Sequence, residues 1–173
     1  MKNDLSFDYI SKDILSNKRY QRLASETHHG ITRMEHSLRV ARNTYKIAKK
    51  LKLDYESATR AALLHDFFTI EEFGENRGLI QGVVHPDIAL ANAKAEFNIN
   101  AIEANAIEAH MFPLNMTLPK YKESWLLTGV DKVVAIYEYL SYKFSYTKVT
   151  GKLATSISLY GLFLFNVLTM GRK

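Results

Sequence analysis

Histidine and aspartate are the residues of this sequence that could bind a transition-metal ion, and two of them are adjacent in an apolar segment. The stretch RAALLHDFF contains the pair His65–Asp66, followed by two phenylalanines. Burying an unpaired carboxylate costs on the order of several kcal/mol, so Asp66 requires a charged partner. Arg60 lies nearly two helical turns away, whereas a divalent cation would meet the need directly. Imidazole and carboxylate together suit iron, manganese, zinc or nickel better than calcium.

Further residues of the same types are spread along the chain. A single histidine on an apolar face is usually a hydrogen-bonded residue without a special role. An ordered series of histidines together with His65–Asp66 and a later aspartate requires a different explanation. Asp131 lies beside an apolar face in LLTGVDKVVAIYEYL and also needs a partner, either a metal or a base such as Lys132. The remaining histidines are His28, His29, His36, His85 and His110.

The composition is that of a globular domain without cysteine. Of the 173 residues, 47% are hydrophobic and 24% charged, which is enough apolar material for a core. Without cysteine, disulfides, thiolate metal sites and cysteine nucleophiles are excluded, and any metal is left to histidine and carboxylate. The same absence suits a reducing cytoplasm, and the first residues lack the apolar region of a signal peptide.

The charge balance indicates a mild attraction to anions. The net charge is +5, from 23 Lys and Arg against 18 Asp and Glu. A phosphorylated small molecule or an anionic membrane surface fits this charge. The basic residues are scattered, so the sequence does not indicate a nucleic-acid-binding arm.

Apolar residues recur with helical periodicity nearly throughout, which predicts an all-α single domain with its core at about 26–143. Adjacent residues on a helix point about 100° apart, so His65 and Asp66 could both reach one ion only at a helix end. Phe67 and Phe68 would then anchor that corner in the core. The predicted helices cover 5–16, 18–25, 33–52, 55–68, 86–97, 101–111, 122–143 and 153–170.

Polar residues at the expected helix starts support these bounds. Thr32, Asp54 and Asn100 are suitable N-caps, and Pro86 suits the first turn of a helix. Residues 26–32 are expected to form a loop, and 69–84 a longer connection. The predicted apolar stripe of helix 33–52 consists of Leu38, Ala41, Tyr45, Ala48 and Leu51.

The segment 153–170 carries no charged residue and allows two interpretations. As a helix it would be about 27 Å long, at the short limit for crossing a bilayer. Flanking basic residues such as Lys152 and Arg172 would fit a tail anchor at the cytoplasmic membrane face. Ser156, Ser158 and Asn166 favour instead a helix that packs on the core or forms a homodimer.

The order of these residues resembles the HD superfamily of metal-dependent phosphohydrolases. The matching motifs are MEHSLRVA, ALLHDFF and GVDKVVA, with the histidines of VVHPDIALA and EAHMFPL between the last two. The resemblance covers roughly 26–140 and implies an all-α helical bundle. The chain is also similar to small bacterial single-domain HD proteins. Its motif order is similar to that of HD enzymes that cleave diadenosine tetraphosphate.

The resemblance implies a metal site and a catalytic role for His65 and Asp66. His36, His65, Asp66 and Asp131 would hold one ion, and His85 and His110 a second, with Asp66 bridging both. One or two divalent ions (Fe, Mn, Ni, Co or Zn) would then activate a water for attack on phosphorus. In the alternative with one ion, His85 would orient phosphate or water.

Other charged residues are candidates for substrate binding. His28, His29, Arg33 and Lys132 could contact a phosphate, although an exposed surface role is the alternative for the two histidines and the lysine. Lys120, Lys122 and Arg77 are weaker candidates of the same kind. Glu35 neighbours His36 but should point to another face of the helix. Cyclic-dinucleotide phosphodiesterases of the superfamily have lysine where this chain has Thr69, so that activity is not predicted.

The favoured function is therefore a metal-dependent phosphohydrolase that acts on a small phosphorylated molecule, with a nucleotide as the first choice. A non-catalytic nucleotide- or metal-binding sensor would keep the same ligands without turnover. A di-iron oxygenase is the third alternative, because a few binuclear HD proteins use oxygen in place of water.

Overall fold

The computed structural model describes residues 5–28, 31–73 and 79–146. The chain divides into two compact units, Met1–Tyr139 and Leu140–Lys173. The site residues discussed below belong to the first unit. The predicted helix at 153–170 lies outside the described residues. Within the described part of the chain, no helix has both the length and the apolarity that a bilayer crossing requires.

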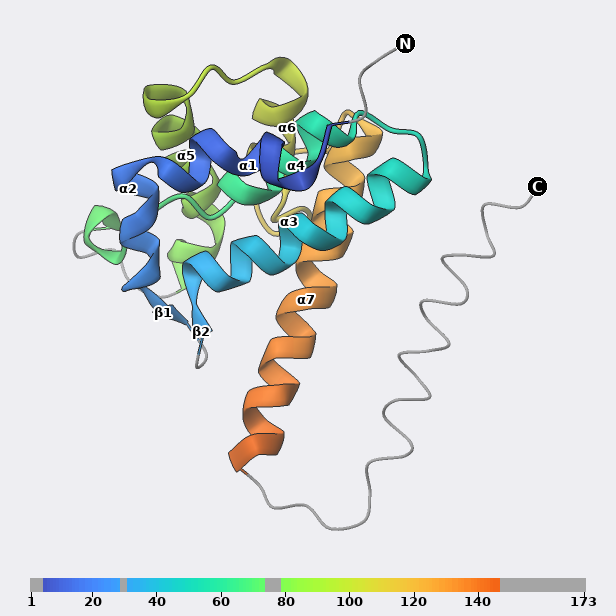
Figure 1. The fold of residues 1–173 in the computed structure, drawn as a ribbon. Coiled ribbons are helices and arrows are strands. Elements are labelled where there is room, and N and C mark those ends of the chain that lie inside the picture. The colour runs from blue at the N-terminus through green and yellow to red at the C-terminus, as the bar shows by residue number, and fades with distance from the viewer. Residues whose placement is uncertain (1–4, 29–30, 74–78, 147–173) are drawn as a thin grey trace. The chain divides into compact units, whose positions relative to one another are not determined.

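Helices make up nearly all of the described regular structure, so the predicted all-α class is confirmed (Figure 1). A two-residue antiparallel pairing joins β1 (Thr27–His28) to β2 (Ile31–Thr32). The α-helices are α1 (Phe7–Ser16), α2 (Lys18–Gln21), α3 (Arg33–Lys50), α4 (Tyr55–Leu64), α5 (Leu79–Glu96), α6 (Ala101–Ala109) and α7 (Lys122–Tyr146), with 3-10 turns η1 (Arg22–Ala24) and η2 (Ile70–Phe73).

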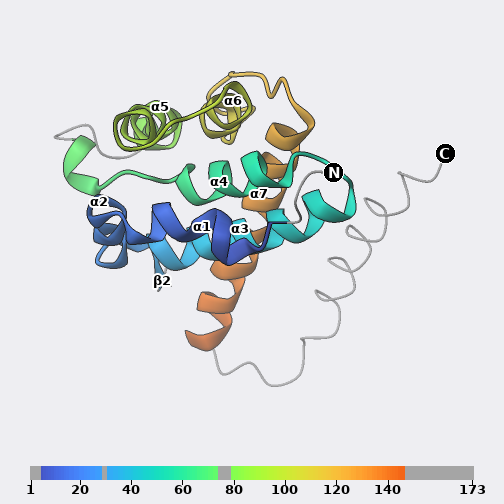
Figure 2. The same cartoon turned by 45° about the horizontal axis from the view of Figure 1, so that its top comes forward.

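Helix α4 is the centre of the first unit. It contacts α1 and α3 on one side and α5 and α6 on the other (Figure 2). Its buried face combines alanines with Leu63 and Leu64, all without solvent exposure. Alanine allows neighbouring helices to approach closely, and burial of the leucines supplies about 1.5–3 kcal/mol each. The C-terminal end of α4 therefore lies in the interior of the unit.

Side-chain caps explain where several helices begin. The hydroxyl of Thr32 accepts the Glu35 N–H, and the Glu35 carboxylate accepts the Thr32 N–H, which is a complete capping box. Asp54 and Asn100 accept N–H groups three residues ahead in the same way. These three predicted caps are confirmed. Each satisfies a backbone donor that has no partner within its helix.

Some predicted helix bounds and the predicted loop are wrong. Helix α4 ends at Leu64, four residues before the predicted end, because the chain turns at the His–Asp pair. Residues 26–32 include the β1–β2 pairing in place of a plain loop. Helix α5 begins at Leu79, so Pro86 lies inside it and not in its first turn. The helix passes through Pro86 although proline removes one backbone donor.

The predicted apolar stripe of α3 is also wrong in part. Ala41 and Ala48 are buried, but Leu51 is 56% exposed. The buried face instead carries polar and small side chains, including His36, Ser37 and Thr44. The buried face of α3 is therefore rotated relative to the predicted apolar stripe, and it turns His36 toward the centre of the unit.

Glu72 connects the segment after the His–Asp pair to two helices. Its carboxylate accepts the Thr69 N–H at 2.7 Å, an Arg19 N–H at 2.7 Å and the Asn92 amide at 3.1 Å. The Asn92 amide also donates to the Phe67 carbonyl at 2.9 Å. Burial would raise the pKa of Glu72, but these donors outweigh it and hold that pKa below its ordinary value.

Replacing Glu72 with Ala should lower the free energy of unfolding by about 1–3 kcal/mol at neutral pH, because three donors lose their acceptor. The matched change Glu71→Ala should cost less than about 1 kcal/mol, since the ion pair of Glu71 with Arg22 lies on the surface. Urea unfolding measures both. An equal loss of unfolding free energy in the two variants would show that the hydrogen bonds of Glu72 do not stabilise the fold.

The stabilisation by Glu72 should also depend on pH. Its folded-state pKa is lowered, so its contribution is present above the ordinary value of 4.5 and is lost as pH falls through the folded-state value. In urea unfolding, the difference between wild type and Glu72→Gln should therefore shrink in acid. A difference that stays constant or grows would show that the charge of Glu72 does not stabilise the fold.

Candidate metal centre

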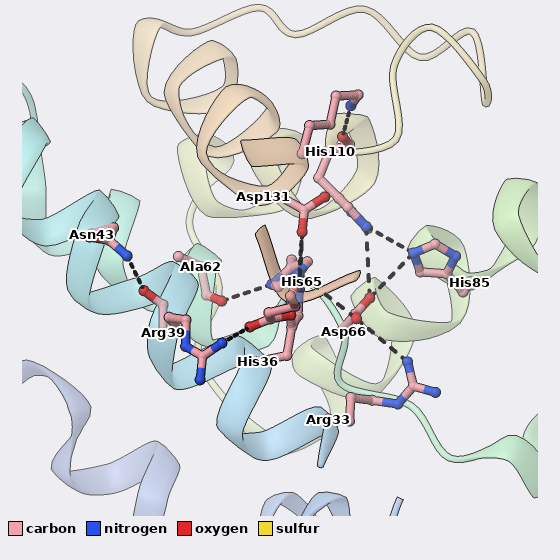
Figure 3. Close-up of polar contacts among 12 residues, drawn as sticks. Arg33, His36, Arg39, Asn43, Ala62, His65, Asp66, His85, His110 and Asp131 are labelled. Carbon is pink, nitrogen blue, oxygen red and sulfur yellow. Dashed lines mark hydrogen bonds and ion pairs between the residues drawn. The ribbon is translucent and has the colours of Figure 1, made fainter. Parts of the chain in front are cut away.

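The six residues predicted as metal ligands lie together in the structure, contributed by five helices or helix ends (Figure 3). All are buried except Asp66, which is partly exposed. Their side chains converge on one space, with the His–Asp pair at its centre. The contributors are His36 on α3, His65 and Asp66 after α4, His85 on α5, His110 after α6 and Asp131 on α7.

The His–Asp corner forms because α4 stops at Leu64. His65 is the C-cap residue, and the Phe68 N–H donates to the Asp66 carbonyl at 2.8 Å, which turns the chain away from the helix axis. Phe67 packs against Tyr20, and Phe68 against Phe73; both phenylalanines are at most 3% exposed. The predicted anchoring of this corner is confirmed. Two adjacent side chains can therefore face the same space.

A first group of donors consists of His36, His65 and Asp131. Asp131 Oδ1 lies 3.1 Å from His36 Nε2 and 3.3 Å from His65 Nε2. One ligand atom from each residue falls within 4.8 Å of the others, as a single ion requires. His65 Nε2 is fully buried and has no hydrogen-bond partner. A buried polar atom without a partner is costly, and coordination of a metal would satisfy this one.

A second group consists of Asp66, His85 and His110. Asp66 Oδ1 lies 3.3 Å from His85 Nε2 and 3.8 Å from His110 Nε2, and the two Nε2 atoms are 2.8 Å apart. Two ring nitrogens at that distance repel each other unless a proton or a cation lies between their lone pairs. His65, Asp66 and His110 also offer one ligand atom each within 4.8 Å. The three residues His65, Asp66 and His110 therefore fit a cation as well, and His85 lies beside them.

The two oxygens of Asp66 face different neighbours. Oδ1 faces His85 and His110, whereas Oδ2 lies 3.9 Å from His65 Nε2 and 3.5 Å from Arg33 Nη1. One carboxylate thus borders both groups of donors. This arrangement is what a carboxylate that bridges two ions needs.

Hydrogen bonds at Nδ1 orient three of the histidines. His65 Nδ1 lies 2.8 Å from the Ala62 carbonyl, and His110 Nδ1 lies 2.7 Å from the Ile107 carbonyl. His36 Nδ1 lies 2.7 Å from a carboxylate oxygen of Glu138. Such oxygens only accept, so each Nδ1 carries the hydrogen and each Nε2 is left to face the centre.

The acidic groups of the centre stay ionised. Burial alone would raise the pKa of Asp66, but the nearby His65 and His85 outweigh it and hold that pKa well below its usual range. Burial also opposes ionisation of Asp131, yet contacts with His36 and His65 lower its pKa. The centre therefore keeps two negative charges that attract a cation.

The histidines respond to those charges in opposite ways. Burial opposes a charge on His36, but its contacts with Asp131 and Glu138 raise its pKa to about 10. Burial, followed by the nearby His65 and His85, lowers the pKa of His110 to about 3. Metal binding by this protein would therefore release a proton from His36, because a ligand nitrogen must be unprotonated.

Glu138 is a member of the cluster that the sequence analysis missed. It lies seven residues after Asp131 on α7, two helical turns further along the same face. That spacing is a signal the sequence contains. Glu35 is exposed, and its carboxylate serves in the Thr32 capping box.

The residues proposed for substrate binding are only partly described. Arg33 is 6% exposed, its Nη1 lies 3.5 Å from Asp66 Oδ2, and its Cζ lies 3.7 Å above the Phe68 ring centre. Lys132 Nζ donates to the His110 carbonyl at 3.0 Å. Lys120 and Lys122 are exposed. The side chain of His28, all of His29 and Arg77 lie outside the described residues.

Comparison with known families agrees with this geometry. The model of the family described as HD domain matches residues 33–155, which include all six clustered residues. A search of curated proteins and a search of solved structures each returned no match. The family match covers well over half of the sequence, from α3 past the end of α7. The chain therefore belongs to the HD domain family.

Proposed function

We propose that this protein is a metal-dependent phosphohydrolase that acts on a small phosphorylated molecule, with a nucleotide as the first choice. The observation that carries the proposal is the pair of donor groups bordered by the single carboxylate of Asp66. Membership of the HD domain family, whose members are generally metal-dependent phosphohydrolases, supports the same reaction class.

In this proposal, His36, His65, Asp66 and Asp131 hold one divalent ion, and His85 and His110 hold a second with Asp66 shared. The ion could be Fe, Mn, Ni, Co or Zn, since imidazole and carboxylate ligands suit each of them. When bound, such ions supply Lewis-acid activation of water and of the phosphoryl group. With a single ion, His85 would instead orient phosphate or water.

The residues of the chain itself have three tasks. Ionised Asp66 and Asp131 provide the negative charge, and the Nδ1 hydrogen bonds hold the histidines in place. Arg33 supplies planar donors beside the Asp66 carboxylate, and its Nε is buried without a hydrogen-bond partner. A phosphate oxygen would satisfy that donor, and stacking on Phe68 holds the guanidinium plane.

The remaining parts of the proposal rest on the sequence. A cytoplasmic location suits a chain without cysteine. His28, His29 and Lys132 are further candidates for phosphate contacts, and no nucleic acid is expected as a partner. Residues 153–170 are proposed to pack on the core or to join two copies of the chain, with membrane contact as the alternative.

The central test is metal binding with turnover. Purified protein loaded with manganese, iron, cobalt or nickel should hydrolyse members of a panel of nucleotides and phosphodiesters. Asp66→Ala should lower kcat/KM at least about 100-fold, because both donor groups lose their shared oxygen ligand. The control Asp8→Asn, an exposed carboxylate on α1, should behave as wild type.

Three results would contradict the proposal. Full turnover by Asp66→Ala would show that the carboxylate is not part of the mechanism. Nucleotide binding without hydrolysis under any of the metals would favour a sensor, and oxygen consumption with reduced iron would favour an oxygenase.

Arg33→Gln should raise KM for the substrate identified in that screen by about 10-fold or more, because a charge-assisted hydrogen bond is worth about 1.5–3 kcal/mol. Arg33→Lys should rescue little, since lysine lacks the planar donors and the stacking surface. Steady-state kinetics measure both, and Arg22→Gln on the exposed surface is the control. An unchanged KM in Arg33→Gln would assign Arg33 to pairing with Asp66 alone.

A further inference from the structure

The hydrogen bond behind His36 differs from those behind His65 and His110. His65 and His110 donate from Nδ1 to carbonyls three residues back in their own helices. The acceptor of His36 is the carboxylate of Glu138, which is 102 residues further along the chain. One of the three oriented histidines therefore depends on a charged side chain from another helix.

The helix positions explain this difference. His65 and His110 are the C-cap residues of α4 and α6, where the last carbonyls of a helix have no backbone partner. Ala62 and Ile107 supply such carbonyls. His36 is the fourth residue of α3, where the nearby carbonyls already accept hydrogen bonds of the helix. The acceptor that orients its ring comes from outside α3.

Glu138 is fixed in place to be that acceptor. It is 7% exposed, and its second oxygen, Oε1, lies 2.8 Å from Arg39 Nη1. Arg39 follows His36 by one turn on α3, so one carboxylate bridges two side chains of the same helix. The Asn43 amide in turn donates to the Arg39 carbonyl (Figure 3). The arginine compensates the cost of burying the carboxylate.

Glu138 lies behind the histidine and not among the atoms that face the centre. Its Oε2 contacts Nδ1 of His36, whereas Nε2 of the same ring faces Asp131 at 3.1 Å. The two nitrogens point in different directions from one ring. Glu138 can therefore act on a bound ion only through His36.

We propose that Glu138 is a positioning residue of the metal centre. It holds the His36 ring with Nε2 facing the ion and makes that nitrogen a stronger electron-pair donor to the metal. Glu138 is itself held in place by Arg39. This inference rests on His36 being a metal ligand, as the proposed function has it. A carboxylate behind a ligating histidine fixes its tautomer and raises its basicity.

The charge and the hydrogen bond of Glu138 can be separated by substitution. Glu138→Ala removes both, and Glu138→Gln keeps an oxygen acceptor of nearly the same shape without the charge. Loss of such a partner typically weakens metal binding about 10–100-fold. We expect that loss for Glu138→Ala and a smaller one for Glu138→Gln. Arg39→Gln should fall below wild type as well, because the carboxylate loses its second contact.

The experiment titrates Zn²⁺ into the metal-free full-length chain by calorimetry and records proton NMR of the Zn²⁺-loaded protein. Wild type should show a downfield ring N–H proton from the His36–Glu138 bond. Glu138→Gln should retain it with a smaller downfield shift, and Glu138→Ala should lose it. Glu56→Gln, an exposed glutamate on α4, is the matched control and should match wild type in both readouts.

Each result decides one point. If wild type binds Zn²⁺ and Glu138→Ala binds it within about 2-fold with the downfield proton intact, the positioning role is wrong while the proposed function stands. If wild type binds no Zn²⁺, the metal site itself is wrong and the inference falls with it. Should Glu138→Ala fail to fold in the metal-free state, Glu138→Gln decides the point: a Zn²⁺ affinity and a downfield shift that both equal those of wild type would contradict the positioning role.

Discussion

The Asp66 carboxylate is the charge around which the rest of this structure is arranged. It is held in the ionised state although burial opposes ionisation, and its two oxygens face different groups of nitrogens. An ionised buried carboxylate is stable only where cations or strong donors surround it. Arg33 supplies one such donor, and the nearby His65 and His85 also lower the pKa of Asp66.

The placement of this charge depends on where α4 stops. The C-terminal ends of α4 and α6 both meet the centre, since His65 and His110 are their C-cap residues. A helix C-terminus carries a partial negative charge, so two of them add to the preference of the site for a cation. The unpaired carbonyls at the same ends orient the rings. The ends of α4 and α6 thus place the two histidines, orient their rings and add negative potential at the same point.

The sequence predicted the local features of this site well and the long-range ones poorly. The caps at Thr32 and Asp54 depend on residues only three positions apart, and the His–Asp corner on adjacent ones, so the local sequence was sufficient. Resemblance to a known family, more than periodicity, grouped the six ligand candidates. Glu138 was missed because its contact with His36 joins distant segments.

The buried face of α3 is a second feature that the local sequence did not predict. Periodicity places Leu51 inside, whereas the fold exposes it and buries His36 and Thr44. A polar face can be buried when the neighbouring helix offers partners for it, which no count along a single helix can reveal. Pro86 is a similar case, because a proline that suits the first turn of a helix lies instead in the interior of α5.

The alanines of α4 have a consequence for the spacing of the donor atoms. Ala58, Ala61 and Ala62 are fully buried where α4 meets its neighbouring helices. Their side chains therefore help to set how far apart the surrounding helices lie, and those helices carry the donor atoms. The spacing of the donor atoms is thus determined partly by methyl groups that are not themselves donors.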